Sequence, residues 1–326
     1  MEKILVVGGA GYIGSHVCKA LKKKGIVPVV FDNFSKGHQW AVRYGPFIRG
    51  DLLCQEALDR AFTKYEPDGV IHLASLINLR ESFENPYSHY INNVVGTLNL
   101  LKSMVNHRVY NLVFSSSAAV YAPPKHLPLD ENHPLGNLSP YGSTKAICEQ
   151  MIRDFCNSHD LKAICLRYFN AAGADPDGEL GEAHQPETHV IPRLLFTAQR
   201  KQSHFTIYHS NYPTPDKTAI RDYIHVCDLA TGHLLALKHL PQVEGMEPIN
   251  LGTGQGHSIL ELIKQAEAIT GVSIPVKKED QQTSESPILV ANPAKAKNLL
   301  GFEPKFSDLG MILETAWRWH NTPLLV

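Results

Sequence analysis

The sequence predicts an α/β protein with a Rossmann-type, doubly wound parallel sheet and a smaller C-terminal α/β domain, and two observations carry this prediction. The chain opens with a short apolar run, residues 3–7, which leads into a glycine-rich turn and then into Ile13, Val17 and Leu21 at helical spacing. Apolar strands then alternate with helical stretches through the first half of the chain. Such alternation is typical of parallel sheets with right-handed crossovers.

The turn at residues 8–14 fits a dinucleotide-binding fingerprint in two registers. It begins at Gly9 in the G-x-G-x-x-G spacing and at Gly8 in a more widely spaced variant, and both versions continue through Gly11 and Gly14. A turn of this kind lets a diphosphate approach the backbone and rest on the helix N-terminus, where free N–H groups favour negative charge. The opening of the chain therefore predicts a nucleotide cofactor.

The next apolar run, residues 27–31, ends in Asp32. An acid at this place binds the ribose hydroxyls of NAD and repels the 2′-phosphate of NADP. The sequence therefore favours NAD as the cofactor.

The remaining elements extend the alternating pattern as far as Asn170. We expect strands at residues 46–48, 69–73, 111–114 and 163–168, and helices at residues 56–64, 89–106 and 141–159. Beyond Asn170 the pattern loosens, and residues 174–188, which are rich in Gly, Pro and acids, are expected to form a loop. We therefore predict an NAD-binding domain over residues 1–173 and a substrate domain over residues 174–326, with segments of the second domain returning to the first.

Composition and charge exclude several classes of protein. The formal net charge is −1, with Lys and Arg spread along the chain, so no nucleic-acid partner is expected. No apolar stretch is long enough for a transmembrane helix, and the chain runs directly into its first strand without a signal peptide. The six cysteines lack C-x-x-C spacing, which indicates reduced thiols and a cytoplasmic setting. The 17 histidines include no H-E-x-x-H motif or Cys/His cluster, so we expect no metal site.

Tyr141 and Lys145 are the strongest catalytic signal. They lie four residues apart at the start of a predicted helix, which puts a phenol and an ammonium on one face. A free tyrosine has a pKa of ~10, and a fixed cation nearby stabilises the phenolate and lowers that value. A Tyr and a Lys at this spacing are common on solvated helices. The glycine-rich turn, which predicts a nucleotide cofactor, favours a catalytic role for this pair. We interpret the pair as a proton-transfer unit.

Several blocks of the chain together resemble a known family. They are the glycine-rich turn, the serines at residues 115–117, the Tyr141 and Lys145 pair, and residues 167–170. These blocks are similar to the extended short-chain dehydrogenases/reductases that act on nucleotide sugars. Within that group the chain looks most like the UDP-galactose 4-epimerases, at residues 92–97, 168–174 and 221–226.

The resemblance implies a mechanism in which NAD takes a hydride from C4 of the sugar. Tyr141, as phenolate, would take the proton of the 4-hydroxyl, Lys145 would hold the phenolate and the nicotinamide ribose, and Ser117 would donate to the developing 4-oxygen. The 4-keto sugar would then turn over and receive the hydride on its other face. Related dehydratases carry an Asp-Glu pair where this chain has Ala118 and Ala119, which favours simple oxidation and return of hydride.

The resemblance also implies which residues bind the two ligands. Those expected at the cofactor are Gly8, Gly11, Tyr12, Ile13, Gly14, Asp32, Asn33, Asp51, Leu52, Asn93, Tyr141, Lys145 and Tyr168. Those expected at the UDP-sugar substrate are Ser117, Tyr141, Asn170, His189, Arg221 and Leu289. A guanidinium matches phosphate in charge and geometry, which favours Arg221 as an anchor of the UDP diphosphate. The alternative for Arg221 is a surface ion pair with Asp222.

Two departures from the family pattern concern the nucleotides. The family usually has Arg-x-Gly-Asp where this chain has residues 282–285, so a cation that helps to bind the substrate nucleotide is missing. The usual Ala-Gly-x-Lys is replaced by residues 74–77, which removes a lysine expected near the cofactor. Neither departure touches Tyr141, Lys145 or Ser117.

These expectations converge on an NAD-dependent nucleotide-sugar 4-epimerase, an isomerase with UDP-glucose and UDP-galactose as the leading substrate pair. The alternatives are an enzyme of the same scaffold that acts on a uronic, pentose or N-acetylated sugar, and a non-catalytic NAD-binding regulatory protein. In the family that the chain resembles, the residue matching Leu289 partly controls the size of the sugar, and the intermediate volume of leucine then implies a preference for unsubstituted hexoses. A homodimer is expected, because family members pair through helices equivalent to residues 89–106 and 141–159.

Overall fold

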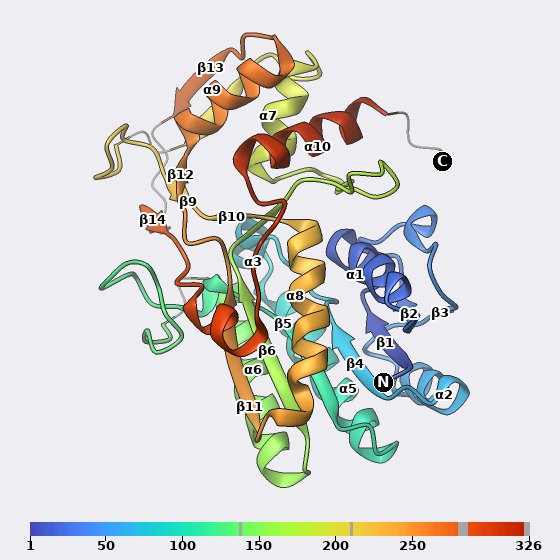
Figure 1. Ribbon diagram of the computed structural model, residues 1–326. Coiled ribbons are helices and arrows are strands. Elements are labelled where there is room, and N and C mark those ends of the chain that lie inside the picture. The colour runs from blue at the N-terminus through green and yellow to red at the C-terminus, as the bar shows by residue number, and fades with distance from the viewer. Residues whose placement is uncertain (137–138, 209–210, 280–285, 323–326) are drawn as a thin grey trace.

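A seven-stranded sheet, parallel throughout, forms the centre of the computed structural model, which describes residues 1–136, 139–208, 211–279 and 286–322 (Figure 1). Its strands are β1 (Lys3–Val7), β2 (Val27–Asp32), β3 (Phe47–Arg49), β4 (Gly69–His72), β5 (Asn111–Ser117), β6 (Lys162–Tyr168) and β11 (Met246–Leu251). Their order is β11-β6-β5-β4-β1-β2-β3, so the chain reverses direction across the sheet between β1 and β4. A reversal of this kind is the switch point at which doubly wound folds bind ligands. The Rossmann-type fold is confirmed.

Helices cover both faces of this sheet, and β1 shows why. Ile4 and Val6 face a core shared with α1 (Tyr12–Lys23) and α8 (Val226–His239), whereas Leu5 and Val7 face a second core on the opposite side. That second core is covered by α2 (Gln55–Tyr65), α5 (Gly96–Asn106) and α6 (Pro140–Ser158). Alternate residues of a strand point to opposite faces, so a strand buried on both sides is apolar throughout.

The helix expected over residues 89–106 is present in the structure, with a π-helical stretch inside it. It consists of α4 (Pro86–His89), a π-helical stretch η2 (Tyr90–Val95) and α5, and it follows the short helix α3 (Leu79–Glu84). Single π-helical turns inside helices often accompany functional sites. Here the widened turn contains Asn93, one of the expected cofactor residues.

The second half of the chain forms a smaller layer above the carboxyl ends of the strands (Figure 1). Helices α7 (Val190–Ala198), α9 (Ile259–Thr270) and α10 (Leu309–Asn321) share a core with β8 (Phe205–Tyr208), which pairs in parallel with the more exposed strand β13 (Val276–Glu279). Two more small sheets are β7 (Asn170–Ala172) with β10 (Tyr223–His225), and β9 (Ile220–Arg221) between β12 (His257–Ser258) and β14 (Ile288–Leu289). The remaining short turns are η1 (Gln39–Ala41), η3 (Ala118–Val120), η4 (Leu240–Gln242) and η5 (Ala296–Leu300).

Two segments of the second half return to the central sheet. β11 pairs with β6 over six residues, and α8 packs against α1. Residues 174–188 carry no helix or strand, as expected from their composition. The division into domains 1–173 and 174–326 stays a prediction. Residues 282–285, where the family motif is replaced, lie outside the described part of the chain.

None of the helices in the described residues is both long and apolar enough to span a bilayer.

Candidate active site

The glycine-rich turn is closed so tightly that side chains would not fit at two of its glycines. Gly8 has a φ of +84°, and a Cβ there would lie 2.6 Å from the backbone nitrogen of Ala74. A Cβ on Gly14 would lie 2.1 Å from the carbonyl oxygen of Gly8. The first turn of α1 is therefore held directly against the backbone after β1, which leaves its N-terminal N–H groups open to a diphosphate. The geometry fits the cradle that NAD requires.

Asp32 braces this turn from the end of β2. Its carboxylate accepts hydrogen bonds from Ala10 N at 3.0 Å and from Phe34 N at 2.8 Å, and the residue is 8% exposed. Burial raises the pKa of Asp32, and the backbone hydrogen bonds act in the opposite direction. Asp32 thus lies where a ribose-binding acid should be, and it also holds the turn in shape.

Three further expected cofactor residues, Asn33, Asp51 and Leu52, follow strands β2 and β3. Asn33 donates to Asp51 at 2.8 Å, so these two expected residues meet. Leu52 is buried beneath Gly96, where a Cβ would lie 2.9 Å from that of Leu52. Asp51 also accepts from Leu53 N at 2.8 Å, so its side chain stabilises the local turn as well.

Asn93 ties the loop after β4 to α6. Its side chain donates to the carbonyl oxygen of Leu76 at 3.0 Å and to Thr144 Oγ1 at 3.0 Å, and it accepts from Leu76 N at 2.8 Å. The segment that lacks the family lysine is thus held by an asparagine. Thr144 is next to Lys145, so Asn93 also helps to place the catalytic helix.

The start of α6 brings the three expected catalytic residues together. Ser139 caps the helix by accepting from Gly142 N at 3.1 Å, and Pro140 occupies the first position, where its missing N–H costs nothing. Tyr141 is hydrogen-bonded to Ser117 at the end of β5. Lys145 is buried and donates to the carbonyl oxygen of Ser115 at 2.7 Å.

The electrostatics of this pair differ from the sequence-based expectation. Burial raises the pKa of Tyr141 to about 12, although the hydrogen bond with Ser117 acts to lower it. Burial also lowers the pKa of Lys145 to about 8. The expected lowering of the Tyr141 pKa by Lys145 is therefore wrong for the protein as described. Desolvation disfavours both charged forms, and the ammonium is directed at Ser115.

Strand register brings three of the expected substrate residues to one place. Arg221 lies opposite Leu289 in the β9–β14 pair, and Asn170 donates to the carbonyl oxygen of Asp222 at 3.0 Å. Arg221 donates to the carbonyl oxygens of Ile220 at 3.0 Å and Pro287 at 3.2 Å. These residues are far apart in the sequence, and only the pairing of short strands unites them.

The alternative for Arg221, a surface pair with Asp222, is wrong because both residues are buried. The Asp222 carboxylate accepts from Thr253 Oγ1 at 2.7 Å, from Gly254 N at 3.0 Å and from Ala291 N at 3.2 Å. Asp222 therefore fixes the loops around β9, which positions Arg221. Leu289 packs against the small apolar cluster of Ala118, Val120, Tyr121 and Leu129, which follows directly after Ser117.

His189 lies immediately before α7, among acids that the sequence analysis did not connect with it. Its Nδ1 is 2.7 Å from Glu182 Oε1 and 2.9 Å from Glu187 Oε1. Burial acts to lower the pKa of His189, but the two carboxylates outweigh burial and raise it to about 10. His184 Nδ1 also lies 3.0 Å from Glu182 Oε1.

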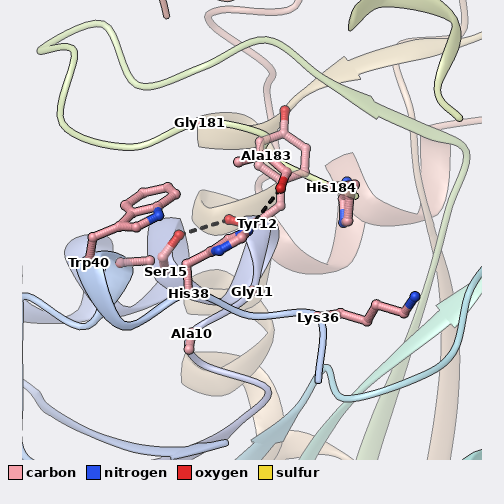
Figure 2. A pocket seen from close by; sticks show the side chains of 11 residues that line it. Ala10, Gly11, Tyr12, Ser15, Lys36, His38, Trp40, Gly181, Ala183 and His184 are labelled. Carbon is pink, nitrogen blue, oxygen red and sulfur yellow. Dashed lines mark hydrogen bonds between the residues drawn. The ribbon is translucent and has the colours of Figure 1, made fainter. Parts of the chain in front are cut away.

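A pocket separates the glycine-rich turn from this segment of the second half (Figure 2). Gly11 and Tyr12 line one side, Ala183 and His184 the other, and His38 reaches across, with its Nε2 2.8 Å from the Ala183 carbonyl oxygen. Tyr12 donates to the carbonyl oxygen of Gly173 at 2.5 Å. Beside the pocket, the Tyr12 ring also contacts the His184 ring edge to face, so residues after Gly173 touch the cofactor turn directly.

A buried polar network under the site was missed from sequence. Arg167 forms a bidentate pair with Glu149, at 2.9 and 2.5 Å, and Ser116 donates to the same carboxylate at 2.5 Å. Arg167 also donates to the Tyr121 hydroxyl at 3.2 Å. The signal available was an arginine inside the apolar run of β6, which requires a buried partner. Tyr168, the next residue, is hydrogen-bonded to Ser115.

Comparison with known proteins decides the family. The model of the NAD dependent epimerase/dehydratase family matches residues 4–252. The chain belongs to this family.

Members of the family resemble the chain over nearly its whole length. A UDP-glucose 4-epimerase of Rhizobium leguminosarum bv. trifolii is 45% identical, over 98% of this chain and 97% of that protein. The crystal structure of UDP-glucose 4-epimerase from Brucella ovis in complex with NAD has a TM-score of 0.95 and 47% identity, over 97% of this chain and 98% of that one. The Bifidobacterium longum enzyme in complex with NAD+ and UDP has a TM-score of 0.93 and 35% identity, over 98% of both chains.

Family membership confirms the expected NAD-dependent epimerase and its cofactor. The glycine cradle and Asp32 fit NAD on their own geometry, as described above. The individual roles of the site residues stay predictions.

Proposed function

We propose that this protein interconverts UDP-glucose and UDP-galactose by epimerisation at C4, as an enzyme of galactose metabolism. The observation that carries the proposal is that Tyr141 is hydrogen-bonded to Ser117 at the end of β5, while Lys145 is bound to Ser115 of the same strand end. Ala118 and Ala119 follow Ser117 and transfer no protons, so the site is equipped for proton transfer at one hydroxyl and not for elimination.

NAD, when bound, supplies the acceptor and later the donor of the C4 hydride. The chain contributes the proton transfer. Tyr141 takes the proton of the 4-hydroxyl and returns it to the 4-oxygen, and Ser117 donates a hydrogen bond to that oxygen. Lys145, four residues further along α6, orients the strand end through Ser115.

We further propose that Arg221 and Asn170 hold the UDP diphosphate, and that Leu289 borders the hexose. His189, the third residue expected at the diphosphate, is instead held by Glu182 and Glu187. Arg221 is fixed by backbone carbonyls on both sides, so its guanidinium loses little freedom on binding. Leu289 faces it across the β9–β14 register and belongs to the apolar cluster that follows Ser117. One short sheet therefore connects the phosphate anchor with the sugar end.

We also propose a homodimer and a cytoplasmic location. Exposed apolar residues gather on the adjoining elements α3 to α6, namely Phe83, Tyr87, Tyr90, Val95, Leu98 and Ile147. A patch of this kind marks an interface. Cys148, Ile152 and Cys156 of α6 are buried in the core of their own subunit, so they do not contribute to it. The six cysteines are free, which suits a reducing compartment.

The test is to incubate the purified protein with a panel of UDP-sugars and to resolve the C4 epimers formed. UDP-glucose and UDP-galactose should each yield the same equilibrium mixture without added reductant. Conversion of only a uronic, pentose or N-acetylated sugar would reassign the substrate. NAD binding without conversion of any sugar would favour the regulatory alternative.

A further inference from the structure

Four side chains of one loop converge on a single point beside the glycine-rich turn. Donor atoms of Glu182, His184, Glu187 and His189 all lie within 4.8 Å of one another. The two imidazoles approach the same oxygen, Glu182 Oε1, through Nδ1 at 3.0 and 2.7 Å. We call these four residues the His/Glu cluster.

The backbone around the cluster is fixed before any ligand arrives. Trp319 Nε1 donates to the carbonyl oxygen of Glu182 at 2.8 Å, and Gly181 packs on the Trp319 ring, where a Cβ would lie only 2.4 Å from it. The backbone N–H groups of Thr188 and His189 each donate to Glu187 Oε1 at 2.8 Å. Such outer hydrogen bonds orient the carboxylates of metal sites.

Among the described residues, the negative charges of Glu182 and Glu187 are balanced only by the two histidines of the cluster. The side chains of Glu182 and Glu187 are 5% and 6% exposed, and their ion pairs in the described residues are with His184 and His189. Two buried carboxylates need two positive charges nearby, because an unpaired buried charge is costly. Two protons on the imidazoles or one divalent cation would provide them.

A second carboxylate cluster in this protein already contains a cation, which the chain itself provides. Asp175, Asp177 and Glu179 also converge, but Lys19 Nζ occupies their centre, at 2.6, 2.8 and 2.7 Å. The protein supplies its own cation there. In the His/Glu cluster, two imidazole nitrogens lie where the other cluster has the Lys19 ammonium. Imidazole nitrogens are common metal ligands.

We propose that the His/Glu cluster binds one Zn²⁺ ion through His184, His189, Glu182 and Glu187. Two imidazole nitrogens and two carboxylate oxygens are a ligand set that suits Zn²⁺ in four-coordinate geometry. Metal–ligand bonds of about 2.0–2.2 Å place tetrahedral ligands roughly 3.3 Å apart, so the three contacts at 2.7–3.0 Å need to widen by only a few tenths of an ångström.

The site would join the two halves of the molecule at the cofactor. The His184 ring contacts that of Tyr12 edge to face, with centroids 6.4 Å apart, and Tyr12 follows Gly11 in the glycine-rich turn (Figure 2). Zn²⁺ would hold residues 182–189 against this turn. The ion is structural, because the cluster supplies all four ligands and leaves no open position for substrate.

The experiment uses the full-length, untagged protein, treated with a chelator and then freed of it. Titration with ZnCl₂ in a calorimeter should show one site per chain, and metal analysis after dialysis should recover about one zinc per chain. Zinc at 100 times its Kd should raise the Tm by roughly 5 °C. No binding at micromolar zinc would overturn the proposal.

Variants separate this site from adventitious binding at surface histidines or thiols. Glu182→Gln and His184→Asn should each weaken zinc binding at least tenfold, whereas Asp177→Asn, in the cluster that Lys19 fills, should leave it unchanged. Zinc binding that is equal in all four proteins would place the ion elsewhere.

A spectroscopic measurement keeps the test decisive if a variant fails to fold. Co²⁺ bound to the wild-type protein should show the intense visible absorption of four-coordinate cobalt. The weak spectrum of octahedral, largely hydrated cobalt would contradict the proposed ligand set.

Discussion

Tyr141 shows how strongly burial controls a single functional group. Its position four residues before Lys145 is the one expected of a proton-transfer pair, yet its pKa is raised to about 12 and that of Lys145 is lowered to about 8. Both shifts disfavour the charged forms. The phenol is therefore held ready by Ser117, and its ionisation has to be favoured by the charges of bound ligands.

Tyr141→Phe removes the phenolic oxygen and nothing else. We expect kcat to fall by at least ~10²–10⁴-fold, the loss typical of a general acid–base, with folding and NAD binding retained. Turnover of UDP-galactose measures kcat, and the NAD content after gel filtration measures cofactor binding. Tyr208→Phe, at a half-exposed tyrosine of β8, is the matched control. Near-normal activity of the Tyr141 variant would remove this residue from the mechanism.

Leu289→Ser tests whether one side chain sets the size of the sugar. Because relief of a clash lowers the barrier only for the substrate that clashes, kcat/KM for UDP-N-acetylglucosamine should rise relative to that for UDP-glucose. Leu260→Ser, on the outside of α9, should change neither value. Equal changes for both sugars in the Leu289 variant would mean that Leu289 does not border the pocket.

At the scale of elements, helix α1 depends on its contact with the turn that precedes it. The Gly14 position leaves no room for a Cβ, which would lie 2.1 Å from the backbone oxygen of Gly8. Asp32 holds the same turn through Ala10 N. The cofactor cradle is therefore a property of β1, α1 and β2 together.

Gly14→Ala should push α1 away from the turn. We expect NAD binding to weaken at least tenfold and the free energy of unfolding to fall by about 1–3 kcal/mol, as in other overpacked sites. Cofactor content after gel filtration and denaturant unfolding measure these effects. Ser15→Ala, one residue further along α1, removes only a hydroxyl bonded to the Tyr12 carbonyl oxygen and should leave NAD binding intact. Unchanged NAD content in the glycine variant would contradict the cradle.

At the scale of the whole molecule, the exposed apolar patch on α3 to α6 predicts assembly. Light scattering at micromolar concentration should give twice the chain mass of 36.2 kDa. Leu98→Glu places a charge within the patch and should yield a monomer, because burying an unpaired carboxylate is costly. Leu260→Glu should stay dimeric. A wild-type monomer would exclude the proposed interface.

Buried neutral histidines predict how stability depends on pH. Burial lowers the pKa values of His16, His225 and His233 to about 4 and that of His72 to about 3. Between the unfolded pKa of about 6.5 and these values, the unfolded chain binds more protons than the native protein. The free energy of unfolding should therefore fall as the pH decreases from 6.5 to 4.

His233→Leu isolates one of these groups. Its Nε2 is buried without a hydrogen-bond partner in the described residues, and its Nδ1 meets the Leu229 carbonyl oxygen at 2.8 Å. Between pH 7 and pH 4, the free energy of unfolding should fall by up to about 3 kcal/mol less in the variant than in the wild type. Urea unfolding at several pH values measures the difference. Parallel pH curves would show that His233 is not held neutral by burial.

The sequence alone determined the local features of this protein. The glycine spacing, the apolar runs, the helix carrying Tyr141 and Lys145, and the acid that ends β2 were all predicted, because strand and helix periods and turn chemistry are written in neighbouring residues. The fold class follows from their alternation. The helix expected over residues 89–106 is confirmed, but its π-helical stretch at Tyr90–Val95 was not predicted; Asn93 in that stretch bonds to Leu76 and Thr144, which are distant in the sequence.

Tertiary structure alone decided how distant segments meet. The register of β9 with β14 sets Arg221 opposite Leu289, β11 returns to complete the sheet, and Glu149 finds Arg167 in the core. The loop after Gly181 collects two histidines and two glutamates that belong to no metal motif. Burial then reverses the expected ionisation of Tyr141. Packing and desolvation depend on every segment that surrounds a residue, whereas local sequence patterns describe only its neighbours along the chain.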